Sequence, residues 1–293
     1  LNKDFLYYLL GSPYIFSEFD RLAAGSTVRN LNIGLVSSVE IPIPPLTEQK
    51  QIVAILDKAF ATIDQAKANI DKNIQNAQEL FQSKLNEIFS QKSAGWEEKT
   101  LGEVCVVERG SSPRPIKKYL TDSEEGVNWI KIGDVPENDK YVKSTKQKIT
   151  REGSKKSRFV DVGDFILSNS MSFGRPYIMA IQGYIHDGWF VLRLPDYLNP
   201  DYFWQLLASP YIKVQFNSLA AGAIVKNISG DLVKKALIPI PPIDDQEKIF
   251  HESEKLKNQT NLIINKYHLK AENLDELKKS TLQKAFAGEL TDE

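Results

Sequence analysis

The chain has 293 residues, of which 37 are basic and 38 are acidic, so its formal net charge is −1. With 26% charged and 42% hydrophobic side chains, it is typical of a globular protein that is neither disordered nor embedded in a membrane, and its length predicts about two domains. A charge this close to zero argues against a protein that holds nucleic acid by bulk electrostatics alone.

Targeting segments and metal-binding patterns are not evident in the sequence. No stretch approaches the roughly 18 apolar residues of a membrane span, and no basic segment precedes an apolar core. Cys105 is the single cysteine, which excludes an internal disulfide and a thiolate metal cluster and suits a reducing compartment. His186, His251 and His268 are too scattered to indicate a metal site. We therefore expect a cytoplasmic protein without a cofactor.

A long internal repeat organises the chain. Residues 1–52 align without a gap with residues 198–249 at a constant offset of 197, and 25 of the 52 positions are identical. The shared sequence IPIPP ends at Pro45 and again at Pro242, and the register continues to Phe286. A repeat this long indicates a duplicated domain-plus-helix unit rather than a solenoid. The second copy is expected to be complete, whereas the first should hold only its C-terminal part.

Residues 1–44 are predicted to be this C-terminal remnant of a first domain. An amphipathic helix is expected over residues 4–22. Some of its apolar side chains should face a core that is missing: Phe5, Leu6, Leu9, Leu10, Ile15, Phe19 and Leu22. An exposed apolar patch of this kind predicts self-association.

Two long helices are predicted, over residues 45–93 and 242–293. In the first, apolar side chains recur every 3.6 residues between Ile52 and Ile88. The second is expected to carry a similar stripe: Ile249, Leu256, Ile263, Tyr267, Leu274, Leu277, Leu282 and Phe286. A lone helix of this length cannot bury its stripe, so we expect the two to pair as antiparallel helices. The alternative is that each helix packs on its own domain.

Residues 94–241 predict a domain of mixed, mostly β structure. Strands are expected over residues 102–108, 127–132, 165–168, 177–182 and 189–194. An amphipathic helix over 201–219 repeats the one over 4–22. The fold class is therefore α+β: a mostly-β domain with a small helix pair, plus two long helices that form an antiparallel coiled-coil-like spacer.

No catalytic constellation stands out, because the sequence contains neither a phosphate-binding glycine loop nor a zinc-protease motif. Asp161 and Asp164 could pass for paired carboxylates, but a tight turn before a strand explains them better. His186, before Asp187–Gly188, is more readily a turn or satisfied surface residue than a general base. We expect a non-catalytic protein and keep a nuclease that uses Asp161 and Asp164 as an alternative.

Three polar segments suit nucleic acid. Residues 140–158 carry eight basic and one acidic side chain, and are expected to hold phosphates, while residues 111–118 and 169–175 are expected to read bases. A plain solvated surface remains the alternative for these charges. The candidate DNA-binding residues are Arg109, Ser111, Ser112, Arg114, Lys117, Lys118, Lys143, Lys146, Lys148, Lys155, Lys156, Arg158, Asn169, Ser170, Ser172, Arg175, Lys226 and Asn227.

The chain resembles the DNA-specificity subunit of type I restriction–modification systems. The resemblance rests on the opening Gly95–Trp96, the Gly163–Asp164 turn before a strand, and IPIPP followed by a glutamine and a long helix, which occurs twice. In that family two target-recognition domains each read half of a bipartite DNA site. Two antiparallel helices fix the gap between the half-sites and dock the modification subunits, and the partner subunits carry out catalysis.

The resemblance implies a DNA-recognition subunit with one complete recognition domain over residues 94–241 and a first recognition domain that is largely missing. Its partners would be DNA, methyltransferase (modification) subunits and, indirectly, the restriction subunit. The near-zero charge implies weak DNA binding until a partner joins. The alternative is a truncated scaffold that forms a homodimer through residues 1–44 and binds modification subunits without reading DNA.

Overall fold

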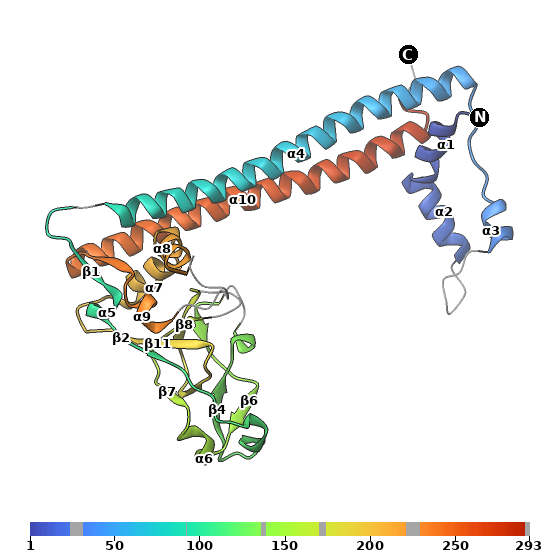
Figure 1. Ribbon diagram of the computed structural model, residues 1–293. Coiled ribbons are helices and arrows are strands. Elements are labelled where there is room, and N and C mark those ends of the chain that lie inside the picture. Colours follow the sequence, from blue (N-terminus) through green and yellow to red (C-terminus); the bar gives the residue numbers. More distant parts are fainter. Residues whose placement is uncertain (24–31, 92, 136–138, 170–173, 221–228, 291–293) are drawn as a thin grey trace. The chain divides into compact units, whose positions relative to one another are not determined.

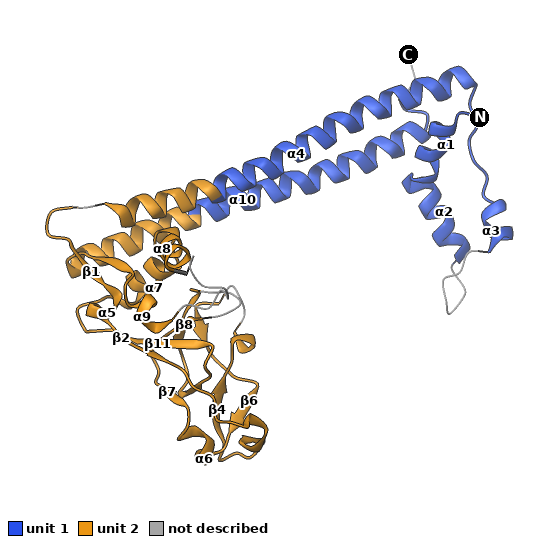
Figure 2. Cartoon of the chain, in the orientation of Figure 1, with its two compact units in different colours: residues 1–78, 259–293 blue, residues 79–258 orange. Residues whose placement is uncertain are grey.

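The computed structural model describes residues 1–23, 32–91, 93–135, 139–169, 174–220 and 229–290. The chain forms two compact units (Figures 1 and 2): unit 1 comprises residues 1–78 with 259–293, and unit 2 comprises residues 79–258. Each unit includes part of α4 (Leu46–Ser90) and part of α10 (Ile243–Phe286). Among the described helices, none combines the length and the apolar character that a bilayer crossing needs.

The described part of unit 1 is helical. In it, three short helices precede α4: α1 (Lys3–Leu10), α2 (Pro13–Ala23) and α3 (Ile33–Ser37). Asn2 caps α1, because its side-chain oxygen accepts hydrogen bonds of 2.9 Å from the backbone N–H groups of Asp4 and Phe5. The core of the unit consists of side chains from α1, α2, α4 and α10: Phe5, Leu9, Ile15, Ile52, Val53, Leu56, Phe60, Ile63 and Ala285.

The long helices run antiparallel within unit 1. Lys67 on α4 forms an ion pair of 2.6 Å with Asp275 on α10, and Asp64 pairs with Lys278 at 3.1 Å, so residue numbers rise along one helix as they fall along the other. These exposed pairs contribute little to stability, and the apolar stripe between the helices contributes more. The predicted fold class, including the paired long helices, is confirmed.

The apolar stripe follows the prediction on α4 and departs from it on α10. The stripe residues of α4, from Ile52 to Ile88 at the predicted spacing, are all buried or half-buried. On α10, Ile263 and Leu277 are exposed, so their assignment to the stripe was wrong. Ile264 and Lys278 take the inward positions, and the Lys278 ammonium lies 4.8 Å from the centre of the Phe60 ring.

The described residues of unit 2 form three β-sheets. A five-stranded sheet has the order β2–β11–β8–β9–β5, a second has the order β3–β6–β4–β10–β7, and β1 pairs with β12 in an antiparallel two-stranded sheet. The strands are β1 (Glu97–Thr100), β2 (Val106–Arg109), β3 (Leu120–Thr121), β4 (Val127–Ile130), β5 (Tyr141–Val142), β6 (Gln147–Ile149), β7 (Arg158–Val160), β8 (Phe165–Ser168), β9 (Pro176–Met179), β10 (Gly183–Ile185), β11 (Trp189–Arg193) and β12 (Leu237–Ile240).

The β2–β11–β8–β9–β5 sheet is covered on both faces, as the alternation of β8 shows. Phe165 and Leu167 belong to a core shared with α7 (Pro200–Ala208) and α8 (Pro210–Ala220). Ile166 belongs to a second core, shared with residues of β4 and β10. Burial on both faces explains why β8 reads as a continuous apolar run. Shorter helices complete the unit: α5 (Leu101–Val104), α6 (Arg151–Ser154) and α9 (Gly230–Val233).

Two predictions of local structure were wrong. The helices expected over 4–22 and 201–219 are each broken into a pair, because Pro13 and Pro210 lack the N–H that a continuous helix needs. The expected strand over 102–108 begins as helix α5, where the Glu103 carboxylate accepts a 2.7 Å hydrogen bond from the N–H of Thr100.

The sequence repeat is also a structural repeat, built around a buried glutamine. In unit 2, Gln246 accepts a 2.7 Å hydrogen bond from the N–H of Asn199 and donates to the Pro241 carbonyl at 2.9 Å. In unit 1, Gln49 accepts from the N–H of Asn2 at 2.7 Å and donates to the Pro44 carbonyl at 2.7 Å. Each glutamine thus ties the start of a short helix pair to the proline that precedes a long helix.

Candidate nucleic-acid interface

The loop that follows β2 lies against the turn between β10 and β11. The N–H of Gly110 donates to the Trp189 carbonyl at 2.8 Å, and the N–H of Ser111 donates to the Ile185 carbonyl at 3.2 Å. A Cβ at position 110 would lie 2.1 Å from the carbonyl oxygen of His186, so only glycine fits there. The close backbone approach sets the course of residues 111–118.

Asp187 is the centre of this contact. Its carboxylate accepts a 2.6 Å hydrogen bond from the Ser112 hydroxyl and pairs with Arg114 at 3.4 Å. Its backbone carbonyl accepts from Arg109 Nε at 3.1 Å and from Asn169 Nδ2 at 3.0 Å. Arg109 and two predicted segments, 111–118 and the start of 169–175, therefore meet at a residue that was predicted only as part of a turn.

The electrostatics keep Asp187 ionised and leave Arg114 accessible. The hydrogen bond from Ser112 holds the pKa of the Asp187 carboxyl below its usual value. The Arg114 side chain is 80% exposed, so its contact with Asp187 orients a guanidinium whose other N–H groups face solvent. A bidentate donor held in this way suits a guanine edge or a phosphate.

The segment around Lys156 joins the same cluster through its backbone. The Ser111 hydroxyl donates to the Lys156 carbonyl at 3.0 Å, and the Ser157 hydroxyl donates to the Ser111 carbonyl at 2.8 Å. The Lys156 ammonium donates to the Tyr119 hydroxyl at 2.5 Å, and this bond raises the pKa of the lysine. Lys117 and Lys118 are exposed on the short 3₁₀ turn that precedes Tyr119. Lys155, directly before Lys156 in the sequence, is also exposed.

Part of the predicted basic charge is neutralised within the fold. Glu108 pairs with Arg158 at 2.9 Å and with Arg193 at 2.5 Å. The guanidinium of Arg158 is therefore already engaged by a carboxylate. Lys155 and Lys156, which lie beside Arg158 in the sequence, carry charges that are more available to phosphates.

The other predicted residues make their described contacts with residues other than Asp187, or fall outside the described residues. Lys148 lies in β6, opposite Thr121 and Asn128, while Lys143 and Lys146 are exposed just before that strand. Arg175 is half-buried, and its N–H donates to the Ser168 hydroxyl at 3.0 Å. Four candidates fall outside the described residues: Ser170, Ser172, Lys226 and Asn227.

The groups weighed for catalysis have structural contacts. Asp164 accepts from the N–H of Asp161 at 2.9 Å, and Asp161 accepts from Gln182 Nε2 at 2.8 Å, as expected for a turn before a strand. His186 is largely buried between Trp129 and Trp189, and burial lowers its pKa. Burial also raises the pKa of the Cys105 thiol to about 12. The described residues contain no cluster of three or more potential metal ligands.

Asp187 and Glu108, the two acids that organise the site, were not predicted from the sequence. Their signals were weak: an Asp-Gly turn, and one acid beside an arginine at the end of a strand. Each gains its role only from sheet pairing, which sets Glu108 opposite Val191 and places the 186–188 turn beside Gly110.

Comparison with known families decides what this domain is. Residues 1–76 and 93–273 match the family described as the type I restriction modification DNA specificity domain. The chain belongs to this family. The match covers both copies of the internal repeat and the whole Asp187 cluster.

Curated relatives of this family resemble the chain along most of its length. The EcoKI specificity subunit of Escherichia coli K12 is 24% identical over 309 residues, which cover 98% of this chain and 65% of the relative. A putative specificity subunit of Haemophilus influenzae is 26% identical over 276 residues, which cover 90% of this chain and 66% of the relative. The chain thus spans just under two thirds of the length of these relatives.

Solved structures share the fold. The HsdS subunit of Thermoanaerobacter tengcongensis superposes with a TM-score of 0.64 at 22% identity, covering 99% of this chain and 71% of the other. A chain from a structure of the type I R-M system superposes with a TM-score of 0.71 at 22% identity, covering 98% of this chain and 71% of the other.

Proposed function

We propose that the chain is the non-catalytic DNA-recognition subunit of a type I restriction–modification complex, that it reads one half of a bipartite site, and that it docks methyltransferase subunits on its long helices. Catalysis is assigned to the methyltransferase and restriction subunits, and the restriction subunit is proposed as an indirect partner of this chain. The observation that carries the proposal is that Arg109, Ser112, Arg114 and Asn169 meet at Asp187, while Lys156 and Ser157 join the same loop through Ser111. Membership of the specificity family supports it.

The residues divide into two roles. Ser112 and Arg114, positioned by Asp187, and Arg175 are proposed to read base edges. Lys117, Lys118, Lys155 and Lys156 are exposed cations and are proposed to hold phosphates, together with Lys148 on β6 and with Lys143 and Lys146 just before that strand. Ser170, Ser172, Lys226 and Asn227 keep their proposed roles on the sequence pattern alone.

Binding-site selection with the methyltransferase subunit present tests this reading. The wild-type chain is expected to enrich one half-site sequence. The double variant Arg114→Ala with Arg175→Ala should lose about 2–6 kcal/mol of discrimination, because each bidentate contact contributes roughly 1–3 kcal/mol. The control Lys143→Ala should weaken binding to all sequences alike. Preference that survives in the double variant, or that is absent in the wild type, would refute the assignment.

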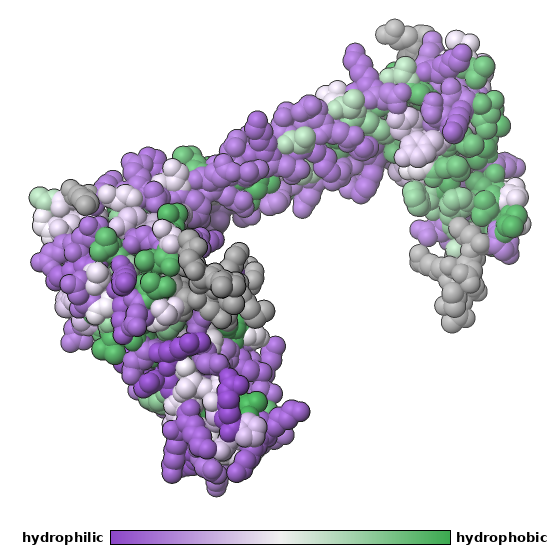
Figure 3. All heavy atoms as spheres, in the orientation of Figure 1, coloured by the Kyte–Doolittle hydropathy of each residue, from purple (hydrophilic) through white to green (hydrophobic). Residues whose placement is uncertain are grey.

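A specific observation favours a second function, self-association through unit 1. Ile43 is 62% exposed, whereas its repeat equivalent Ile240 is 8% exposed; Val36 is 45% exposed, and its equivalent Val233 is fully buried. In unit 2 strand β1 lies against Ile240, and the described part of unit 1 has no corresponding strand. Figure 3 shows hydrophobic surface gathered over α1 to α3. We propose that a second copy of this chain covers this surface.

Light scattering is expected to give the mass of two chains at micromolar concentration. The variant Ile43→Lys with Val36→Lys should be monomeric, because it places two charges in the apolar contact, and should fold normally, since both positions are exposed. Leu262→Lys, an exposed apolar residue on α10, is the matched control and should leave the dimer intact. A wild-type chain that stays monomeric would remove the scaffold alternative.

A further inference from the structure

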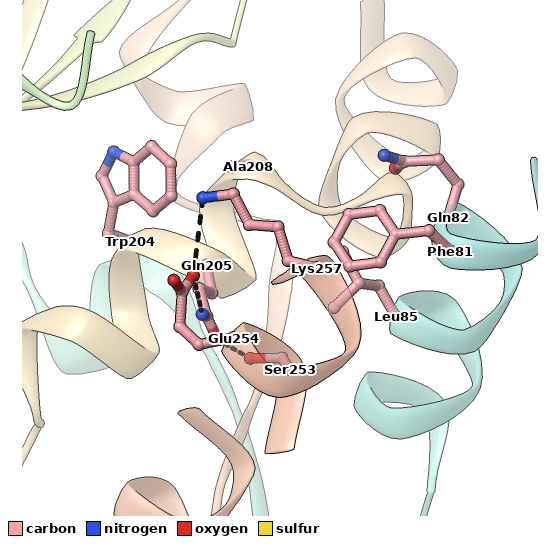
Figure 4. Close-up of a pocket in the computed structure, with 9 residues that line it drawn as sticks. All are labelled: Phe81, Gln82, Leu85, Trp204, Gln205, Ala208, Ser253, Glu254 and Lys257. Carbon is pink, nitrogen blue, oxygen red and sulfur yellow. Dashed lines mark hydrogen bonds and ion pairs between the residues drawn. The ribbon is translucent and has the colours of Figure 1, made fainter. Parts of the chain in front are cut away.

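Unit 2 contains a cavity of about 140 Å³ that the DNA-reading site does not use. Its walls come from three helices: Phe81 and Leu85 on α4, Trp204 and Ala208 on α7, and Ser253 with its neighbours Glu254 and Lys257 on α10. Figure 4 shows Gln205, Ser253 and Glu254 linked at one side, with the apolar side chains of α4 at the other. The cavity is therefore apolar with one polar edge.

Because of the internal repeat, unit 1 contains an equivalent of this cavity, and there the ring of Tyr8 fills it. Residue 205 corresponds to Tyr8 in unit 1, at the offset of 197. The Tyr8 ring packs edge-on against Phe60 at 5.4 Å, and its hydroxyl donates to Asp57 at 2.5 Å, which raises the pKa of Tyr8 to about 12. Leu56, fully buried, packs in the same cluster.

Two substitutions between the copies remove this filling from unit 2. Gln205 stands where unit 1 has Tyr8, and Ser253 stands where unit 1 has Leu56. The phenylalanine and lysine of this place are kept, but they swap helices. Unit 1 has Phe60 on α4 and Lys278 on α10, and the equivalent positions of unit 2 hold Lys257 on α10 and Phe81 on α4. The net loss is one aromatic ring and one branched aliphatic side chain. A dry cavity of about 150 Å³ is known to accept one benzene ring, so the space left here suits a single ring.

The polar edge matches the hydroxyl of a phenol. Glu254 corresponds to Asp57, which accepts from the Tyr8 hydroxyl in unit 1. In unit 2, Glu254 accepts instead from Gln205 Nε2 at 3.0 Å and pairs with Lys257 at 3.5 Å, and Gln205 accepts from the Ser253 hydroxyl. Both Gln205 and Ser253 are buried. The acceptor of the phenol contact is thus retained while the chain's own tyrosine is absent.

We propose that this cavity binds a tyrosine side chain of a protein partner, with the ring between Trp204, Phe81 and Leu85 and the hydroxyl donating to Glu254. The space suits one ring and opens to solvent, so a partner can insert a tyrosine that it carries on its own fold, as α1 of unit 1 does with Tyr8. The identity of that partner as the methyltransferase subunit rests on the proposed function; the phenol site itself does not.

The test of the site uses p-cresol, which is the side chain of tyrosine, and the methyl resonances of the chain. The Leu85 and Ala208 methyl groups should shift with a Kd on the order of 1 mM. The Leu282 methyl, which corresponds to Leu85 in unit 1, should not move, because Tyr8 occupies that place. Toluene, which lacks the hydroxyl, should bind about tenfold more weakly. Unmoved Leu85 and Ala208 methyl groups would overturn the phenol site.

Two variants test whether a protein partner occupies the cavity. Gln205→Tyr with Ser253→Leu installs the residues of unit 1, and Gln205→Tyr alone is the milder change; both should abolish the p-cresol shifts. With the purified methyltransferase subunit, the filled variants and saturating p-cresol should each weaken the complex roughly thirtyfold, as expected for a buried aromatic anchor. If the wild type forms the complex, and neither the filled variants nor p-cresol weakens it, the partner assignment is wrong. If the wild type forms no complex, the proposed function fails as well, and the methyl shifts still decide on the site.

Discussion

Replacing Gly110 by alanine is expected to destabilise unit 2 by about 3–5 kcal/mol and to abolish DNA sequence preference. The added Cβ would lie 2.1 Å from the carbonyl oxygen of His186 and 2.9 Å from its carbonyl carbon. Both are backbone atoms, so no side-chain rotation can relieve the clash. The loop must move away from the 186–188 turn.

That movement removes the contacts that build the proposed interface. The hydrogen bonds from Gly110 to Trp189 and from Ser111 to Ile185 would lengthen, and Ser112 would leave the Asp187 carboxylate. Chemical denaturation measures the loss of stability, and binding-site selection measures the loss of preference. Gly133→Ala is the matched control, because nothing lies within 4 Å of a Cβ there. Equal behaviour of the two variants would show that the close approach at Gly110 has no role.

The sequence predicted the parts of the fold that depend on periodicity and repetition. The 3.6-residue spacing from Ile52 to Ile88 gave the inward face of α4 at every position, because one long uninterrupted helix obeys its own geometry. On α10 the predicted stripe was wrong at Ile263, where Ile264 lies inward instead, and at Leu277, where Lys278 lies inward over the Phe60 ring. A cation counted as polar in a pattern can still take an inward position when an aromatic ring covers it.

The site was predictable only in part, because it depends on contacts between distant strands. The basic and hydroxyl residues of 109–118 stood out by composition, but Asp187 acts on them across 75 residues of sequence through the pairing of β2 with β11. Pro13 and Pro210 are local signals of a helix break, but the apolar pattern that continues across each of them favoured one unbroken helix. Short strands such as β3 and β5, with two residues each, carry no periodic signal at all.

Gln246→Ala is expected to destabilise unit 2 by about 3–5 kcal/mol, because it leaves buried backbone groups without partners. The Gln246 side chain is buried, accepts from the N–H of Asn199, and donates to the carbonyls of Tyr197 at 3.2 Å and Pro241 at 2.9 Å. Alanine cannot replace any of these three bonds. It also leaves a cavity that the packed surroundings cannot fill, which lowers the stability further. Hydrogen exchange should report the loss at the start of α7 and the end of β12.

The repeat provides the comparison that makes this prediction specific. Gln49→Ala removes two bonds of the same kind in unit 1, to the N–H of Asn2 and the carbonyl of Pro44, and should lower protection there by a smaller amount. Gln259→Ala, an exposed glutamine on α10, should change stability by less than about 0.5 kcal/mol. If Gln246→Ala changed the stability as little as Gln259→Ala, the glutamine that follows each IPIPP would not be what holds the short helix pair to the long helix.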